Sequence, residues 1–139
     1  MRLLYIDPSA FIKRYVVEED SEKCQELISQ FSLHCISNIG TTEVLINLKK
    51  RLGNREHFLA SRLFEGDLAA VNVIAFDDQI SKEAVKVSDG KNLATLDSIH
   101  IATALRFKSR DVTFLTYDKA QAQAARRNGL KTLGVLTSG

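Results

Sequence analysis

With 139 residues the chain is long enough for one domain with its own core, and we predict a single domain over residues 1–139. Hydrophobic residues make up 45% and charged residues 26%, as in ordinary soluble proteins, while a net charge of +2 neither demands nor excludes a nucleic-acid partner. A chain with only two cysteines has no disulfide framework and no cysteine-based zinc site. We find no signal peptide and no apolar run long enough to span a bilayer, and we therefore predict a cytoplasmic protein with no membrane partner.

Short apolar runs alternate with helical patterns along the first half of the chain. The run over residues 3–6 predicts a strand buried on both faces, and it stops at Asp7-Pro8-Ser9, where the proline suits the first turn of a helix. The other elements predicted for this half are helices over residues 9–17 and about 21–31, a strand over residues 34–37, a helix opened by residues 40–42, and a helix ending near residue 68.

The second half continues the alternation of strands and helices. Its predicted elements are a strand over residues 71–76, a helix over about 77–87, a helix over 96–108 that is apolar almost all round, a strand over 111–117, a helix over 118–127 and an edge strand over 131–136. This order predicts a mainly parallel sheet of four to five strands covered by helices on both faces, which is a three-layer α/β/α sandwich.

Four acidic residues are predicted to meet in a crevice beyond the carboxyl ends of the strands. Asp7 follows the first strand, Asp118 follows the fourth, Asp97 starts the apolar helix and Glu43 lies in the first turn of the third helix. Neighbouring carboxylates repel one another, so such a cluster is costly unless a cation lies among them. A hard ion such as Mg²⁺ or Mn²⁺ prefers oxygen ligands, activates water and neutralises charge on a phosphoryl oxygen.

A simpler interpretation competes with this one for each acid taken alone. Asp is a favoured N-cap residue, and Asp7, Asp97 and Asp118 all stand at predicted helix starts. The pair Asp77-Asp78 also follows a strand, and we interpret it as a cap. Glu43 can be explained as part of a partly solvated helix face. No single acid is therefore specific, although the set of four is suggestive.

Four separated segments of the chain resemble PIN-domain proteins, particularly VapC-like toxins. The segments are Tyr5-Ile6-Asp7-Pro8-Ser9-Ala10-Phe11, Thr42-Glu43-Val44, the run LATLDSIHIATA over residues 93–104, and Thr116-Tyr117-Asp118. The resemblance extends from residue 3 to about residue 135, which is nearly the whole chain. One departure is Pro8, because Thr or another residue is more common there in the family.

The resemblance implies a PIN-like fold and a metal-dependent endoribonuclease that hydrolyses RNA phosphodiester bonds with metal-activated water. The acids that would be catalytic and would hold Mg²⁺ or Mn²⁺ are Asp7, Glu43, Asp97 and Asp118. Ser9 and Thr116 would orient carboxylates or a metal-bound water from behind these acids. His100 lies on the same helical face as Asp97, and we expect it to pack or hydrogen-bond near the pocket rather than to bind the metal.

The family also implies macromolecular partners. Basic residues near the pocket that could contact RNA phosphates are Lys13, Arg14, Lys49 and Lys50, although a solvated face explains each of them alone. The resemblance further implies a small antitoxin protein bound at an apolar groove near the first helices, with Phe11, Tyr15 and Val16 as candidate contacts, and a homodimer. The toxin role is separable from the nuclease, because PIN domains also act in RNA processing.

Two alternatives from other classes stay open at the level of sequence. A phosphoacceptor receiver domain is also a small parallel α/β fold, and Asp77 or Asp78, Thr116 and Lys131 would supply part of its site. Such a domain needs a pair of acids after the first strand, where Asp7 stands alone. The other alternative is a non-catalytic interaction domain whose acids are helix caps, and this alternative predicts no affinity for Mn²⁺.

Overall fold

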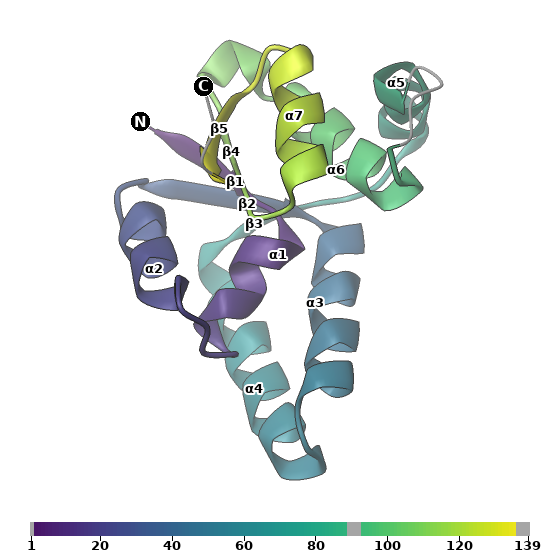
Figure 1. The fold of residues 1–139 in the computed structure, drawn as a ribbon. Coiled ribbons are helices and arrows are strands. Elements are labelled where there is room, and N and C mark those ends of the chain that lie inside the picture. The colour runs from purple at the N-terminus through teal and green to yellow at the C-terminus, as the bar shows by residue number, and fades with distance from the viewer. Residues whose placement is uncertain (1, 89–92, 136–139) are drawn as a thin grey trace.

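A five-stranded parallel sheet forms the centre of the molecule, in a computed structural model that describes residues 2–88 and 93–135 (Figure 1). The strand order is β3-β2-β1-β4-β5, and every neighbouring pair is parallel. Helices α1–α4 cover one face of the sheet and α5–α7 cover the other. The predicted α/β/α sandwich is therefore confirmed, with all five strands parallel.

The elements follow one another in the predicted order. The strands are β1 (Leu3–Ile6), β2 (Leu33–Ser37), β3 (Asn72–Ile74), β4 (Thr113–Thr116) and β5 (Lys131–Gly134). The α-helices of the described residues are α1 (Pro8–Phe11), α2 (Ser21–Ser29), α3 (Asn38–Arg51), α4 (Asn54–Asp67), α5 (Asp78–Ser88), α6 (Thr95–Leu105) and α7 (Lys119–Arg127). Short 3₁₀ turns lie at η1 (Ile12–Arg14), η2 (Leu68–Ala70) and η3 (Lys108–Arg110).

Three predicted boundaries were wrong in informative ways. The helix expected over residues 9–17 ends in the turn η1, because the chain then doubles back and brings Asp20 to within 2.7 Å of Lys13. The strand β4 begins two residues later than predicted, since Asp111 adopts a left-handed backbone with φ of 55° that no strand contains. Gly134, at φ 103°, is the last residue of β5, and residue 136 of the predicted strand lies outside the described residues.

The start of α3 differs from the prediction in a way that moves one of the acids. Ser37 is the N-cap and accepts a hydrogen bond from the Ile39 N–H at 3.1 Å, so the helix begins before residues 40–42. Glu43 consequently lies in the second turn of α3 rather than in the first. This places its side chain alongside α6 instead of at the helix end.

Alternate residues of the central strands enter two separate hydrophobic layers. Leu3 and Tyr5 pack with α5, α6 and α7, whereas Leu4 and Ile6 pack with α1–α4. All four side chains are buried, as expected for a strand with helices on both sides. Because Asp7 follows directly, the same alternation fixes the side of the sheet from which its carboxylate emerges.

The strand order reverses direction between β1 and β4. The chain proceeds from β1 outward to β2 and β3, and then returns to place β4 on the other side of β1. Asp7 and Asp118 follow these two neighbouring strands at their carboxyl ends, where ligands bind in open α/β sheets. Within the described ranges, no helix has the length and the hydrophobicity needed to cross a membrane.

Candidate active site

Asp7 is almost fully buried, and its two carboxylate oxygens have different surroundings. Oδ2 caps α1 by accepting from the Ser9 N–H at 3.1 Å, and it also accepts from Ser9 Oγ at 2.5 Å and Thr116 Oγ1 at 3.1 Å. Oδ1 faces His100 Nε2 at 4.0 Å. Burial raises the pKa of Asp7, while the neighbouring His100 and the Ser9 hydrogen bonds counteract part of this rise. The cap therefore uses one oxygen and leaves the other directed toward the crevice.

Ser9 and Thr116 form the hydrogen-bonded support behind Asp7. The Ser9 hydroxyl accepts from the Tyr117 N–H at 3.0 Å while it donates to Asp7, and Thr116 Oγ1 accepts from the Asp118 N–H at 3.1 Å. These bonds tie the ends of β1 and β4 together. The predicted roles of Ser9 and Thr116 as residues that orient a carboxylate agree with these contacts.

Gln121 is a further member of this network that the sequence analysis did not identify. Its side chain is fully buried, with Oε1 2.9 Å from Thr116 Oγ1 and with Nε2 lacking a partner among the described residues. A threonine hydroxyl has one proton, so it cannot donate to both Asp7 and Gln121. Turning the Gln121 amide over lets Nε2 donate to Thr116 while Thr116 donates to Asp7, which removes the conflict over the single hydroxyl proton. The position of Gln121, in the first turn after Asp118, was the available clue.

Asp118 caps α7 and also faces the crevice. Its Oδ1 accepts from the Gln121 N–H at 3.0 Å, in the manner of an N-cap. The capping interpretation is thus confirmed for Asp7 and Asp118. Each cap occupies one oxygen of the carboxylate, so capping and cation binding are compatible in both residues.

Asp97 is the acid whose position capping does not explain. The N-cap of α6 is Ala94, and Asp97 lies in the first turn without capping the helix. Its pKa is raised to about 6, first by burial and then by the charges of Asp118, Asp7 and Glu43. The carboxylates of four distant segments are therefore close enough to repel one another at this site.

The carboxylate of Glu43 is hydrogen-bonded to a buried histidine at the crevice. Its Oε1 lies 2.5 Å from Nε2 of His100, and His100 Nδ1 lies 2.6 Å from the Tyr5 hydroxyl. Burial disfavours a charged imidazole, but the hydrogen bond with Glu43 and the charges of Asp7 and Asp97 dominate and raise the pKa of His100. Burial keeps the pKa of Tyr5 well above 10.0, so its hydroxyl is neutral. His100 thus packs and hydrogen-bonds at the pocket, in agreement with the expectation from the sequence.

The donor chemistry of the site fits a hard divalent cation. Carboxylate oxygens are the ligands that Mg²⁺ and Mn²⁺ prefer, and burial together with the charges of Asp118, Asp7 and Glu43 raises the pKa of Asp97. Across residues 2–88 and 93–135, no three of the His, Cys, Asp and Glu side chains are grouped tightly enough to enclose an ion as they stand. One carboxylate oxygen of Glu43 is already hydrogen-bonded to His100 in this arrangement.

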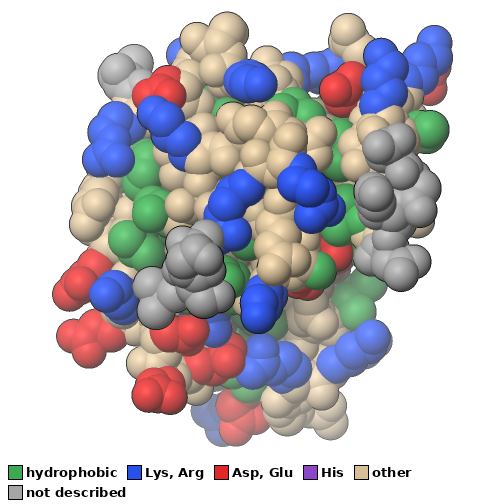
Figure 2. All heavy atoms as spheres, turned by 45° about the horizontal axis from the view of Figure 1, so that its top comes forward, with side chains coloured by type: hydrophobic (Ala, Val, Ile, Leu, Met, Phe, Trp, Pro, Cys, Tyr) green, Lys and Arg blue, Asp and Glu red, His purple; other side chains and the backbone are tan. Residues whose placement is uncertain are grey.

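The predicted RNA contacts fall into two groups. Lys13 is buried, and its ammonium pairs with Asp20 at 2.7 Å and with Glu18 at 3.4 Å, so a contact with an RNA phosphate stays a prediction for this residue. Arg14 is exposed but pairs with Asp67 at 2.9 Å. Lys49 and Lys50 are exposed on the last turn of α3. Figure 2 shows further Lys and Arg side chains spread over the face that carries α7.

The receiver-domain alternative is contradicted by the positions of its residues. Lys131 begins β5 and pairs with Asp111 at 2.7 Å, at the end of the sheet opposite to the carboxyl ends of the strands. Asp77 follows the edge strand β3 and pairs with Arg106 at 2.8 Å. Lys131 therefore lies at the end of the sheet opposite to Thr116, and Asp77 lies beyond the edge strand β3, which β2 and β1 separate from β4.

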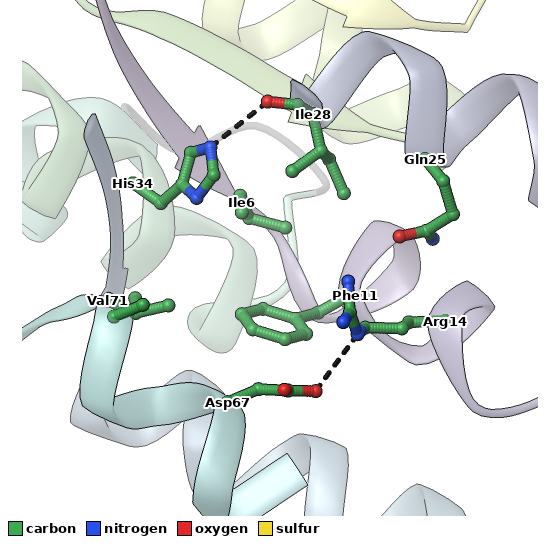
Figure 3. Close-up of a pocket in the computed structure, with 9 residues that line it drawn as sticks. Ile6, Phe11, Arg14, Gln25, Ile28, His34, Asp67 and Val71 are labelled. Carbon is green, nitrogen blue, oxygen red and sulfur yellow. Dashed lines mark hydrogen bonds and ion pairs between the residues drawn. The ribbon is translucent and has the colours of Figure 1, made fainter. Parts of the chain in front are cut away.

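A separate apolar hollow lies on the α1–α4 side of the molecule. Figure 3 shows Phe11, Ile28 and Val71 around a cavity of about 190 Å³, between an ion pair of Arg14 with Asp67 and a hydrogen bond from His34 to the Ile28 carbonyl. Nearby, the outer face of α4 exposes three large apolar side chains, Phe58 (59% exposed), Leu59 (53%) and Leu63 (64%). None of the four acids of the crevice is among the residues that line this hollow.

Comparisons with known proteins agree with this architecture. The family model described as PIN domain matches residues 4–127. Among solved structures, the chain is similar to FitAcB from Neisseria gonorrhoeae (TM-score 0.73, 17% identity, 94% of this chain and 96% of that chain). It is also similar to VapC20 from Mycobacterium tuberculosis, a "Sarcin-Ricin loop cleaving toxin" (0.72, 15%, 96% and 99%), and to a toxin-antitoxin complex from Klebsiella pneumoniae (0.66, 19%, 96% and 96%). A search of curated proteins returned no match.

Proposed function

The chain belongs to the PIN domain family, and from this we propose that it is a divalent-metal-dependent endoribonuclease with Asp7, Glu43, Asp97 and Asp118 as its acidic pocket. The observation that carries the proposal is the surroundings of Asp97. Its carboxyl is influenced by the charges of Asp118, Asp7 and Glu43, although these three residues come from three other segments of the chain. A fold has little reason to gather these charges without a cation to bind there.

The residues of the pocket divide into ligands and supports. Asp7 Oδ1, Asp97, Asp118 and Glu43 would hold Mg²⁺ or Mn²⁺, which supplies a more acidic water and a positive charge beside the phosphoryl oxygens. Ser9 and Thr116 fix Asp7 through Oδ2 and thereby keep Oδ1 directed at the crevice. The Asp118 cap holds its carboxylate relative to β4. Because its pKa is about 6, Asp97 is mostly ionised at neutral pH, and this is the form that can bind a cation.

The test is cleavage of assorted RNAs in vitro with Mg²⁺, with Mn²⁺ and with EDTA. We expect cleavage only with a metal, and we expect Asp97→Asn to lower the rate by on the order of 10³-fold, since metal charge stabilisation is worth several kcal/mol. Asp111→Asn is the matched control, because it removes the charge of an exposed carboxylate that pairs with Lys131 at the other end of the sheet. Cleavage that persists in EDTA, or in Asp97→Asn, would refute the proposal.

We further propose that the protein is a toxin held inactive by a small antitoxin. Support comes from the similar structures of toxins and toxin-antitoxin complexes and from the exposed apolar face of α4 beside the hollow in Figure 3. Expression should arrest growth, and Asp7→Asn should relieve the arrest. Unimpaired growth with an active nuclease would instead favour a role in RNA processing. A homodimer stays a prediction, which light scattering of the purified protein can check.

A further inference from the structure

Tyr5 is a buried polar residue of β1 whose hydroxyl the proposed ligand set does not use. Its ring stacks on Phe114 with centroids 5.2 Å apart and planes within 3°. Its hydroxyl accepts from the backbone N–H of Ser37 at 3.1 Å and lies 2.6 Å from His100 Nδ1. Both Tyr5 and His100 are almost completely buried, so water cannot replace either partner.

The hydrogen bonds of Ser37, Tyr5 and His100 determine which nitrogen of the neutral imidazole carries its hydrogen. The Ser37 backbone N–H can only donate, so it occupies a lone pair of the Tyr5 oxygen. The remaining partner of that hydroxyl among the described residues is His100 Nδ1, so the Tyr5 proton must point there. Nδ1 is then an acceptor without a proton, and Nε2 carries the hydrogen. A proton on Nδ1 would leave the Tyr5 O–H buried without an acceptor.

In this tautomer the ring directs an N–H, rather than a lone pair, toward the carboxylates of Glu43 and Asp7. Nε2–H donates to Glu43 Oε1 at 2.5 Å and faces Asp7 Oδ1 at 4.0 Å. The opposite tautomer would direct a lone pair at both carboxylates. Gly40 lets α3 come this close, because a Cβ at that position would lie 2.9 Å from His100 Cε1.

We propose that Tyr5 is a positioning residue that holds His100 in the Nε2–H tautomer, and that this N–H fixes the Glu43 carboxylate at the metal pocket. The role of Glu43 as a ligand rests on the proposed function. In this series of hydrogen bonds, the Ser37 N–H donates to the Tyr5 oxygen, the Tyr5 O–H donates to His100 Nδ1, and the His100 Nε2–H donates to Glu43.

The first test reads the tautomer directly, by long-range ¹H–¹⁵N correlation spectra of the imidazoles of the full chain at pH 7.5. The chain has three histidines, and His100→Gln identifies the signal by its loss. We expect an unprotonated Nδ1 and a protonated Nε2 in the wild type, and a mixture of tautomers in Tyr5→Phe. The control Tyr15→Phe deletes a hydroxyl that donates to Asp67, far from this site, and should leave the signal unchanged. A protonated Nδ1 in the wild type, or an unchanged pattern in Tyr5→Phe, overturns the proposal.

The second test measures Mn²⁺ binding by calorimetry, without RNA. We expect affinity to fall by about 10-fold in Tyr5→Phe, as is typical when a group behind a metal ligand is removed, and by less than about 2-fold in Tyr15→Phe. Phe retains the stacking on Phe114, so the fold should survive, and thermal unfolding of both variants checks this. Equal Mn²⁺ affinity in Tyr5→Phe and wild type overturns the positioning role. A wild type that shows the tautomer and binds Mn²⁺ but cleaves no RNA refutes only the proposed function.

Discussion

At the scale of single residues, Asp97 shows how a carboxylate can be unfavourable for stability and useful for binding. It caps no helix, and burial together with the acids around it raises its pKa to about 6. In the unfolded chain an Asp titrates near 3.8, so the folded protein binds more protons between about pH 4 and 6. Stability therefore decreases as the pH rises through this interval, and the ionised form is the costly one.

Replacing Asp97 by Asn should accordingly stabilise the metal-free protein at pH 7.5 by about 1 kcal/mol, allowing for the partial exposure of the side chain. The gain should shrink as the pH falls toward 4 and disappear well below 3.8, where Asp97 is protonated in both folded and unfolded chains. Thermal unfolding in EDTA at several pH values measures it. A variant that is less stable than the wild type at pH 7.5 would show that Asp97 is a structural residue.

Lys13 is a basic residue that the structure places in a buried ion-pair network. Its side chain is 7% exposed, contacts the ring of Tyr117 at 4.6 Å and pairs with two acids of the following loop. Lys13→Met keeps the length of the side chain but removes the charge, and we expect a loss of about 2 kcal/mol in the free energy of unfolding. Arg14→Met removes an ion pair that is 53% exposed on the arginine side, and it should cost less than about 1 kcal/mol in urea unfolding. Equal losses in the two variants would contradict this assignment.

At the scale of elements, the sequence predicted which segments are strands and helices better than it predicted where they begin. The apolar runs of β1 and β4 and the acids that follow them were identified, since burial on both faces leaves a continuous hydrophobic pattern. The start of α3 was missed because Ser37 reads as the end of a strand and acts as a cap only in three dimensions. The Tyr5–His100–Glu43 contacts were likewise invisible, as they depend on how closely α3 approaches α6.

Gly40 controls that approach, and its substitution gives a prediction for the element as a whole. In an exposed helix Ala is more favourable than Gly by about 1 kcal/mol. At this position, however, a Cβ would lie 2.8 Å from Ile36 Cγ1 and 2.9 Å from His100 Cε1. We expect Gly40→Ala to destabilise the fold by about 1–3 kcal/mol and to weaken Mn²⁺ binding, because α3 must move away with Glu43.

Gly66→Ala in α4 is the control for Gly40→Ala, since a Cβ at that position would have no atom of the described residues within 4 Å. It should keep or increase stability in urea unfolding. If Gly40→Ala behaved like Gly66→Ala, the packing of α3 against His100 would not limit the position of Glu43.

At the scale of the whole molecule, the reversal of strand order between β1 and β4 explains why a single crevice collects acids from distant segments. Asp7 and Asp118 arrive at the carboxyl ends of neighbouring strands, while α3 and α6 bring Glu43 and Asp97 from opposite faces of the sheet. The sequence supported this convergence through the order of the elements and the family resemblance. It could not supply the side-chain geometry, in which one oxygen of each capping Asp is already occupied.

A cation that joins these segments should stabilise the entire fold. At a Mn²⁺ concentration 100 times its Kd, binding to the folded state alone adds about 2.7 kcal/mol, which corresponds to a rise in Tm of about 5–10 °C for a chain of this size. Differential scanning fluorimetry measures the rise, EDTA should reverse it, and Asp118→Asn should abolish most of it. An unchanged Tm up to millimolar Mn²⁺ would contradict cation binding at this site.

The pairing of β1 with β4 also has a consequence for synthesis. Tyr5 is aligned with Phe114 in the sheet, so β1 cannot pair with β4 until the ribosome has added more than a hundred further residues. Contacts so distant along the chain form slowly and late. A nascent polypeptide therefore lacks Thr116 and Asp118 until more than a hundred residues after Tyr5 have been made, and the proposed acidic pocket cannot assemble before that point.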